Sequence, residues 1–426
     1  EVIKKIEEVI KKMEKSVLLT APMGWGKAAA DTCQTTLGAK IAERLSKEGK
    51  RVGYIAPTLT LIDKKWGLLW SQLDVSIVAT AGASQLCARG HKFYPQRYCH
   101  RCPLQRMPPE GFTPPAKLHY SWLRVNLPED ICPYWVQEGL LLRYPIVLGH
   151  YGRLRKIRGI DVLIIDEIHE FVVPEVRQFD LSQIREHYNI DISSLEALKE
   201  SVEVLLLAHD NEDLWLLYDI LRSEVVWMED NTIYGASLRN MPRDVRILGV
   251  TATPPPGWPP EGWELIEVKP EKKPIAFIFV DYEWRFDKLD ELDAQYYIYE
   301  LIRFAGAGSG FRIAVFATTS RQRLLETIKQ RYNNVDVFDA WGRYRIGVDL
   351  DDYDTAIVLW PSLHISVRRY MRSRGVNPDI SELVNAVQLS GRIRPGPDKN
   401  VVFAGTRFGK YWDYISQFYE LKEVKL

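Results

Sequence analysis

The sequence predicts an α/β protein with two parallel-sheet domains, the first of which carries two insertions. Short apolar segments typical of buried strands recur along the chain, and segments with helical periodicity separate them. A proline-rich stretch at 254–260 then divides the pattern in two. The chain has 426 residues, which exceeds one ordinary core, and its 46% hydrophobic and 26% charged residues are typical of a folded protein.

The first domain begins with a βαβ unit. We expect a strand at 17–20, a glycine-containing loop at 21–27, a helix through about residue 46 and a strand at 51–56. This order implies a parallel sheet, because the crossover helix returns the chain to the end of the sheet where the first strand began, so that the second strand runs in the same direction. Further buried strands of the same domain are expected at 146–148, 162–165 and 247–250.

Two segments interrupt this domain. Residues 85–135 are rich in Cys, His, Arg, Tyr and Pro with little periodicity, which indicates a loop-rich module. Residues 171–243 are amphipathic and predict a mostly helical insertion, with a capping box at Ser193–Glu196. The first domain is then expected to comprise 1–84, 136–170 and 244–270. The second comprises 271–426, with strands at 276–280, 313–317, 356–360 and 401–404 and a helix near 320–332.

Composition limits the possible functions. The chain has 56 basic residues (Lys and Arg together) and 56 acidic residues (Asp and Glu together), so it lacks the excess of basic residues seen in many nucleic-acid-binding proteins. A local basic groove needs only a few cations, however. No run of about 18 apolar residues and no secretory signal is present, which predicts a cytoplasmic protein without a membrane span. Five cysteines in a chain of this size do not suggest a secreted disulfide scaffold.

A phosphate-binding loop is predicted between the first strand and its helix, where the sequence is Ala21-Pro22-Met23-Gly24-Trp25-Gly26-Lys27. Glycines let backbone N–H groups point at phosphates, the helix N-terminus favours an anion, and Lys27 can reach the β- and γ-phosphates of ATP. A plain strand-to-helix turn with a surface lysine is the alternative. Ala28 departs from the usual pattern, because a Thr or Ser hydroxyl normally binds Mg²⁺ at this position.

An acidic pair ends a buried strand in the segment Val162-Leu163-Ile164-Ile165-Asp166-Glu167-Ile168-His169. Ligands of open α/β sheets bind at the carboxyl ends of strands. Asp166 is therefore a candidate metal ligand, Glu167 a candidate to orient or deprotonate the attacking water, and His169 a link to neighbouring motifs. The alternative is a strand that ends in solvated acids.

Four cysteines cluster between the phosphate loop and the acidic pair: Cys87, Cys99, Cys102 and Cys132. The Cys-x-x-Cys at 99–102 favours two ligands on one centre, and either a zinc ion or a 4Fe–4S cluster is compatible with four thiolates. His91 and His100 could replace a cysteine around zinc. Unrelated buried thiols are the remaining alternative, and Cys33 is expected only to pack on its helix.

With the sequence Asp-Glu-Ile-His in place, the chain resembles superfamily 2 helicases of the DEAH type. Residues 249–254, 314–320, 347–350 and 388–394 are similar to their third to sixth motifs. The resemblance implies that Gln388 and Asp349 contact the nucleotide and that Arg392 and Arg394 act as arginine fingers. Two departures are visible: the arginines are two apart instead of three, and Ile346 replaces an acidic residue before Gly347.

The cysteines resemble those of the XPD/DinG branch, in which the last is followed by Pro and an aromatic residue, as in Cys132-Pro133-Tyr134. The element His150-Tyr151 before the acidic motif is similar too.

The resemblance implies two RecA-like motor domains with an iron–sulfur insertion and a short helical arch insertion. It further implies a 4Fe–4S cluster held by the four cysteines, ATP and Mg²⁺ as cofactors, and 5′→3′ movement on single-stranded DNA with unwinding at duplex junctions, as in DNA repair. An ATPase-weakened nucleic-acid-binding scaffold with a zinc or iron–sulfur insertion is the alternative function.

Three basic runs are candidate contacts to a DNA strand, because cations can follow a backbone while aromatic rings stack on bases. The first surrounds the Cys-x-x-Cys, and each run has a solvated charged face as its alternative. The members are Arg97, Arg101 and Arg106 with Tyr94 and Tyr98; Arg153, Arg155, Lys156 and Arg158; and Arg368, Arg369, Arg372 and Arg374.

Overall fold

The structure is a computed structural model in which the chain divides into two compact units. The first takes in most of the chain up to Val250 together with Glu261–Ile266, and the second takes in Thr251–Pro260 and the chain from Glu267 onward. The structure describes residues 8–10, 12, 14–21, 34–90, 99, 102–188, 190–209, 211–229, 231–268, 272–279, 291–306, 310–318, 330, 332–341, 350–395 and 398–424.

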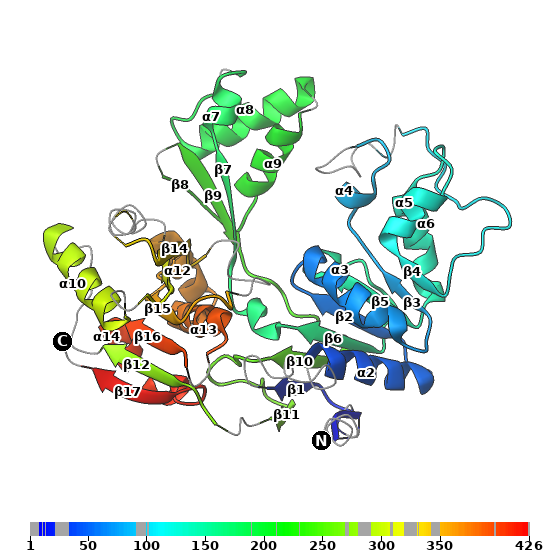
Figure 1. Ribbon diagram of the computed structural model, residues 1–426. Coiled ribbons are helices and arrows are strands. Elements are labelled where there is room, and N and C mark those ends of the chain that lie inside the picture. The colour runs from blue at the N-terminus through cyan, green and yellow to red at the C-terminus, as the bar shows by residue number, and fades with distance from the viewer. Residues whose placement is uncertain are drawn as a thin grey trace. The chain divides into compact units, whose positions relative to one another are not determined.

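An eight-stranded sheet is the centre of the first unit (Figure 1). The strands from β10 through β6, β2, β5 and β3 to β4 pair in parallel. Strands β2 and β6 are buried along their whole length, as parallel strands covered on both faces require. In sheet order the strands are β11 (Glu264–Glu267), β1 (Val17–Thr20), β10 (Arg246–Thr251), β6 (Val162–Asp166), β2 (Val52–Ala56), β5 (Ile146–His150), β3 (Ile77–Ala79) and β4 (Lys117–His119).

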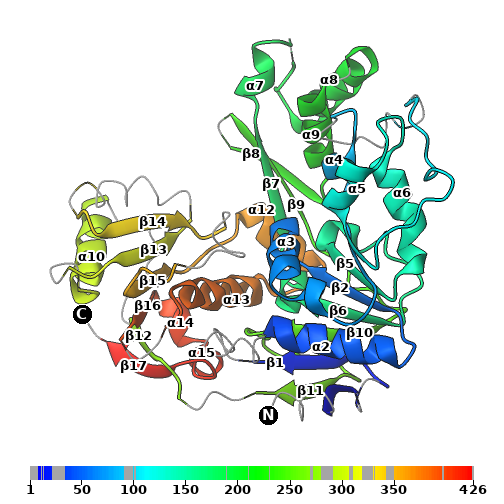
Figure 2. The same cartoon turned by 45° about the vertical axis from the view of Figure 1, so that its right-hand side comes forward.

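Two helices cover this sheet: α2 (Gln34–Lys47) packs on β2, β5 and β6, and α3 (Leu59–Leu68) packs on β2 and β5 (Figure 2). Helix α3 begins where the Thr58 hydroxyl accepts a hydrogen bond from the Leu61 amide at 3.2 Å, which satisfies a donor of the first turn. The remaining helical segments before β7 are short. They are η1 (Trp70–Gln72), α4 (Ala83–Leu86), α5 (Tyr120–Asn126), α6 (Pro133–Leu140), η3 (Leu141–Arg143), η4 (Tyr151–Arg153) and η5 (Ile168–Phe171).

The segment expected to be mostly helical has a mixed structure instead. It contains an antiparallel sheet of order β7-β9-β8, whose strands are rich in the β-branched and aromatic residues that favour extended chain. The helix at 195 is capped by Ser194, whose hydroxyl accepts from the Ala197 amide, and not by Ser193 as predicted. The elements are β7 (Glu175–Asp180), α7 (Ser182–Arg185), α8 (Leu195–Ala208), α9 (Glu212–Leu221), β8 (Val225–Glu229) and β9 (Thr232–Ser237).

A six-stranded sheet is the centre of the second unit, and all of its neighbouring strands run parallel. Its order is β14 (Val335–Asp339), β13 (Ile313–Ala317), β15 (Thr355–Leu359), β16 (Asn400–Ala404), β12 (Ile275–Phe279) and β17 (Glu420–Val424). The helical segments are α10 (Glu291–Phe304), α12 (Ile365–Ser373), α13 (Pro378–Ser390), η7 (Gly391–Ile393), α14 (Thr406–Gly409) and α15 (Trp412–Ile415).

The predicted α/β class with two parallel sheets is confirmed, and each predicted strand lies within about two residues of a strand in the structure. Strands β3, β4, β11, β14 and β17 of these sheets were not predicted; in β17, for example, only the Leu and Val of Glu-Leu-Lys-Glu-Val are apolar. The helix predicted near 320–332 falls mainly outside the described residues. Among the helices that the structure describes, none is both long and apolar enough to cross a membrane.

Candidate functional site

The acidic pair lies at the carboxyl end of the central strand β6. Asp166 is the last residue of the strand and is buried. Glu167 adopts the left-handed conformation, with φ 54° and ψ 48°, and the chain turns there into η5. Such a conformation is uncommon for a residue with a side chain, and surrounding contacts must hold it. The turn separates the two carboxylates, and Glu167 remains the more exposed of them.

Lys65 is the cation that meets Asp166. Its ammonium makes an ion pair with the Asp166 carboxylate and donates a hydrogen bond to the Tyr54 hydroxyl at 2.9 Å. Both partners of the ion pair are largely buried, so the attraction is little screened by water. No sequence pattern indicated Lys65, since it lies on α3, about 100 residues before Asp166 in the chain.

Two carboxylates flank the buried imidazole of His169. Nδ1 lies 3.4 Å from Oε2 of Glu167, and Nε2 lies 3.4 Å from Oε1 of Glu170. Arg239 lies beside Glu170, with Nη1 3.7 Å from Oε2, and donates to the Glu170 backbone carbonyl at 3.3 Å. The chain therefore holds His169 in a row of alternating acidic and basic groups. Arg239 is another residue that no sequence pattern indicated.

Tyr151 holds the turn after β6 from inside the fold. Its hydroxyl lies 2.6 Å from the Asp166 carbonyl and 2.8 Å from the Glu167 carbonyl, so it can donate to either. Burial raises the pKa of Tyr151 well above its ordinary value, and the carboxylates of Glu170, Asp166 and Glu167 raise it further. The phenol therefore stays protonated and remains a donor. The Arg239 guanidinium lies 5.2 Å from the centroid of the Tyr151 ring.

Gly249 lets the next strand approach the turn closely. Strand β10 runs parallel to β6, with Gly249 beside Ile165 and Val250 beside Asp166. A Cβ on Gly249 would lie 2.5 Å from Cδ1 of Ile168, which no real contact allows. Glycine at this position of the third-motif segment therefore has a packing reason: it leaves room for the residue after the acidic pair.

The predicted nucleotide residues are only partly described. Gly24, Trp25, Gly26, Lys27 and Ala28 lie outside the described residues, and so does Asp349. Gln388, Arg392 and Arg394 are described in the second unit.

Gln388 is buried near the end of α13, and its amide donates to the Thr253 hydroxyl at 2.7 Å. Arg392 lies in η7, where its carbonyl accepts from the Leu350 amide at 2.9 Å. Arg394 is left-handed, with φ 53°, and its guanidinium pairs with Asp351. Burial lowers the pKa of Arg394, although a guanidinium remains charged.

The four clustered cysteines are all free thiols, and Cys132 is the buried one. Cys132 immediately precedes α6, and its neighbours Leu86 and Tyr134 belong to the same apolar cluster. Burial raises the pKa of its thiol, amide hydrogen bonds from Trp135 and Tyr134 lower it, and the charges of Cys99 and Cys102 raise it. Cys99, Cys102 and Cys132 are therefore close enough to influence one another.

The donor set fits a thiolate centre in chemistry, with free thiols from both sides of the Cys-x-x-Cys. Over the described parts of the chain, however, no three His, Cys, Asp or Glu side chains are close enough to hold a metal ion. Gln137 connects the two cysteine-bearing segments, because its amide makes two 3.0 Å hydrogen bonds with the Ala81 backbone. His91 and His100 lie outside the described residues.

Two residues of the basic runs are not available to a DNA strand. Arg153 is buried and pairs with Glu138, and Arg368 is buried and pairs with Glu382 and Asp379. The expectation that they contact a backbone is therefore wrong, since their charges are already neutralised inside the fold. Arg106 donates to the Cys99 carbonyl at 2.8 Å. The exposed members are Arg106, Arg155, Lys156, Arg158, Arg369, Arg372 and Arg374, and Tyr94, Arg97, Tyr98 and Arg101 lie outside the described residues.

Comparisons with known proteins find likeness in structure alone: no protein-family model and no curated protein matches the sequence. A solved structure described as "XPD_Helicase" has a TM-score of 0.67 and 16% identity, covering 100% of this chain and 99% of that one. A second, "XPD_APO", has a TM-score of 0.58 and 15% identity, covering 99% and 100%. The structure of Xpd4 from S. tokodaii has a TM-score of 0.54 and 11% identity, covering 99% of both chains.

These matches show that the chain has the fold of XPD helicases over its whole length, with two RecA-like parallel-sheet domains. The resemblance that the motifs indicated is thereby confirmed for the fold. The identities are low, so the likeness does not extend to individual residues.

Proposed function

We propose that this chain is an ATP-hydrolysing superfamily 2 helicase of the XPD type that moves along single-stranded DNA. The observation that carries the proposal is the turn after β6, where Asp166 ends a central parallel strand and Glu167 follows it in the left-handed conformation. Such a turn lies where open α/β sheets bind their ligands. The full-length likeness to XPD helicase folds supports the same function.

In this function Glu167 orients and deprotonates the water that attacks the γ-phosphate. Its left-handed backbone directs the carboxylate away from the strand, and Tyr151 fixes the carbonyls behind it. His169, 3.4 Å away, limits the positions that the carboxylate adopts. Positioned proton transfer of this kind contributes about 10²- to 10⁴-fold to a rate.

Asp166 would hold Mg²⁺, which neutralises phosphate charge when it is bound. A carboxylate at the end of a buried strand fits this role, and Lys65 shows that the position already binds a cation. Lys27 would bind the phosphates, with Gly24, Trp25, Gly26 and Ala28 as their loop. Arg392 and Arg394 would stabilise the transition state. Arg394 would first have to leave its ion pair with Asp351 and pair with phosphate.

Steady-state ATP hydrolysis with and without single-stranded DNA tests the proposal. We expect DNA to stimulate turnover, and we expect Glu167→Gln to reduce it by about 10²-fold or more while ATP still binds. Glu110→Gln, a change of the same chemistry at an exposed loop residue, should leave turnover unchanged. If DNA does not stimulate hydrolysis even after Ala28→Thr, the motor proposal fails and the nucleic-acid-binding scaffold is the better description.

We further propose that Cys87, Cys99, Cys102 and Cys132 hold a 4Fe–4S cluster that organises the first insertion. Anaerobically purified protein should then absorb at roughly 400 nm and contain iron. Cys102→Ser should remove the absorption. Colourless protein that contains zinc would replace the cluster with a tetrahedral zinc site.

Direction of movement is tested by strand displacement. Duplexes that carry either a 5′ or a 3′ single-stranded tail should be unwound from the 5′ tail only. Equal unwinding of both substrates, or unwinding from the 3′ tail, would exclude the XPD-type polarity.

A further inference from the structure

Helix α8 of the insertion at 171–243 has an apolar face that its own fold does not cover. Val204 is 65% exposed and Leu207 is 90% exposed, and they lie three positions apart on one side of the helix. The opposite side is already used, because Leu198 and Val202 are fully buried in the core of the insertion. Val204 and Leu207 therefore contribute little to the hydrophobic core of the insertion.

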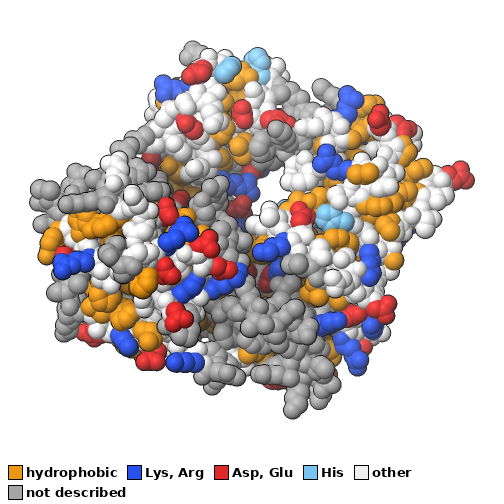
Figure 3. Space-filling view, in the orientation of Figure 1, with side chains coloured by type: hydrophobic (Ala, Val, Ile, Leu, Met, Phe, Trp, Pro, Cys, Tyr) orange, Lys and Arg blue, Asp and Glu red, His pale blue; other side chains and the backbone are white. Residues whose placement is uncertain are grey.

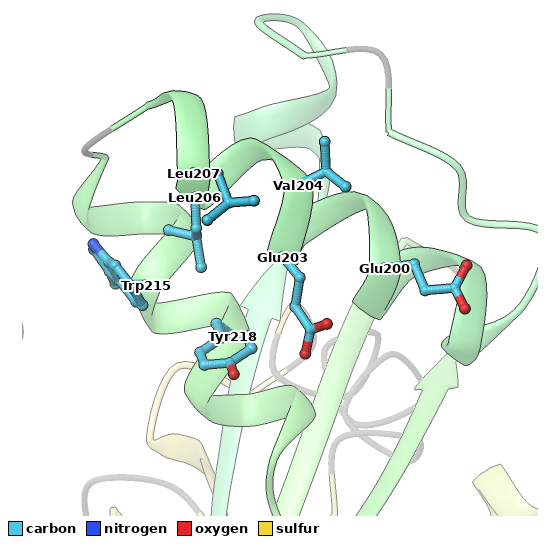
Figure 4. Close-up of a pocket in the computed structure, with 7 residues that line it drawn as sticks. All are labelled: Glu200, Glu203, Val204, Leu206, Leu207, Trp215 and Tyr218. Atoms are coloured by element: carbon cyan, nitrogen blue, oxygen red, sulfur yellow. The ribbon is translucent and has the colours of Figure 1, made fainter.

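These two residues belong to a hollow of about 630 Å³ between α8 and α9. Leu206 from α8 and the rings of Trp215 and Tyr218 from α9 form the rest of its apolar lining (Figure 4). The two rings meet edge to face, with centroids 5.9 Å apart. A concave surface lined by aromatic and branched aliphatic side chains is suited to binding apolar groups.

Acidic groups border this hollow. Glu200 and Glu203 lie on the same stretch of α8 and are exposed, and neither makes an ion pair with any side chain that the structure describes. Residues 191–221, which contain both helices, have eight acidic residues and one basic residue, although the chain as a whole has no net charge. Figure 3 shows acidic side chains among apolar ones over this insertion, at the top of the view.

This charge opposes a nucleic-acid occupant, because a phosphate backbone would be repelled by the uncompensated carboxylates. It favours an apolar segment that carries cations. A groove between two helices commonly takes an amphipathic helix, whose apolar side chains recur at every third or fourth position. Lysines or arginines next to that apolar stripe would face Glu200 and Glu203.

We propose that the α8–α9 groove, lined by Val204, Leu206, Leu207, Trp215 and Tyr218, docks a basic amphipathic helix of a partner protein. This surface is independent of the nucleotide site, since it involves neither of the two parallel sheets. The partner helix would insert its apolar stripe between the helices and pair its cations with the two glutamates.

The probe is a fluorescein-labelled helical peptide with leucines at helical spacing and lysines beside them. Its anisotropy is measured with the full chain at physiological salt. We expect binding to weaken at least about tenfold with Val204→Ser/Leu207→Ser, because two aliphatic side chains leave the interface. Glu200→Gln/Glu203→Gln should weaken binding by about threefold or more and reduce its dependence on salt.

Leu142→Ser is the matched control, since Leu142 is 72% exposed and lies outside the groove; it should bind within twofold of the parent. All substituted side chains are exposed, and circular dichroism melting should show unchanged folding. The proposal is overturned if a peptide with glutamates in place of the lysines binds equally well, or if the groove variants bind as the parent does. It is also overturned if the groove variants leave peptide binding unchanged and abolish self-association of the chain or weaken its binding to a single-stranded oligonucleotide.

Discussion

The Lys65 ammonium and the Asp166 carboxylate form a buried ion pair at the end of β6, and the Tyr54 hydroxyl accepts a second hydrogen bond from the ammonium. The pair joins a helix to the strand that carries the acidic motif. A cation thus already neutralises the carboxylate that we assign to Mg²⁺. Metal binding must share this carboxylate with Lys65 or displace it.

Lys65→Met should therefore raise the affinity of the site for a divalent ion. Removal of a positive charge beside the carboxylate should lower the Mg²⁺ concentration for half-maximal ATP hydrolysis by about three- to tenfold. Direct Mn²⁺ binding, followed by electron paramagnetic resonance, should tighten in parallel. Unfolding in EDTA should occur at a lower temperature, because Asp166 is left buried without its partner. Lys64→Met, at an exposed neighbouring position, is the control; an unchanged Mn²⁺ affinity in Lys65→Met would contradict the prediction.

Tyr151→Phe should loosen the turn that carries Glu167. The substitution removes the hydroxyl donor beside the buried Asp166 carbonyl, at a cost of about 1–3 kcal/mol in the free energy of unfolding, while the Glu167 carbonyl still accepts from the Glu170 amide at 2.9 Å. Turnover should fall more than nucleotide affinity does, because Glu167 loses its position. Tyr144→Phe removes a 2.8 Å hydrogen bond to the Pro115 carbonyl and should lower stability without this effect on turnover.

His150 should make stability depend on pH on the acidic side of neutrality. Burial lowers the pKa of His150, and the nearby Arg153 lowers it further. The folded state therefore favours the neutral imidazole. The stability that follows is present above about pH 6.5, the pKa in the unfolded chain, and is lost as the pH falls towards the lower folded value.

His150→Asn tests this dependence, because an Asn side chain can still accept the 3.2 Å hydrogen bond from the Gly152 amide but does not titrate. Its melting temperature should fall less than that of the parent between pH 7.5 and pH 5.5. His187→Asn, at an exposed position, should follow the parent. Equal losses in parent and His150→Asn would assign the acid sensitivity to other groups.

The buried Glu382 should stabilise the second unit only while its partners are present. Its carboxylate accepts from Trp360 Nε1 at 2.6 Å and from the Leu363 amide at 2.7 Å, and it pairs with Arg368. Arg368→Met should lower the free energy of unfolding by about 3 kcal/mol, because the buried carboxylate then keeps only the more distant guanidinium of Arg407, 3.6 Å away, as a cationic partner.

The double variant Arg368→Met/Glu382→Gln should regain part of this loss, as measured by urea unfolding. Arg369→Met, on the exposed side of the same helix, should cost about 0.5 kcal/mol or less. If the single Arg368→Met variant were as stable as the parent, the pair would have no structural role and Arg368 would return as a candidate strand contact.

The sequence alone determined the class of the fold and most of the strands. Runs such as Val162–Ile165 and Ile313–Ala317 are apolar throughout, because strands buried on both faces exclude polar side chains. The acidic pair could be located for the same reason, since a short apolar run that stops at two carboxylates marks the end of such a strand. The mixed structure of 171–243 was less predictable, because its strands are only partly buried and combine polar with apolar residues.

Only the tertiary structure determined which charges meet. Lys65 and Asp166 are far apart in sequence, and Arg153 and Arg368 have the same local sequence character as their exposed neighbours. Whether such a cation is solvated or paired depends on packing between distant segments, which local periodicity does not encode. The same reason applies to the α8–α9 groove: the helical pattern of α8 predicts apolar positions, and only the fold shows that Val204 and Leu207 are the ones left uncovered.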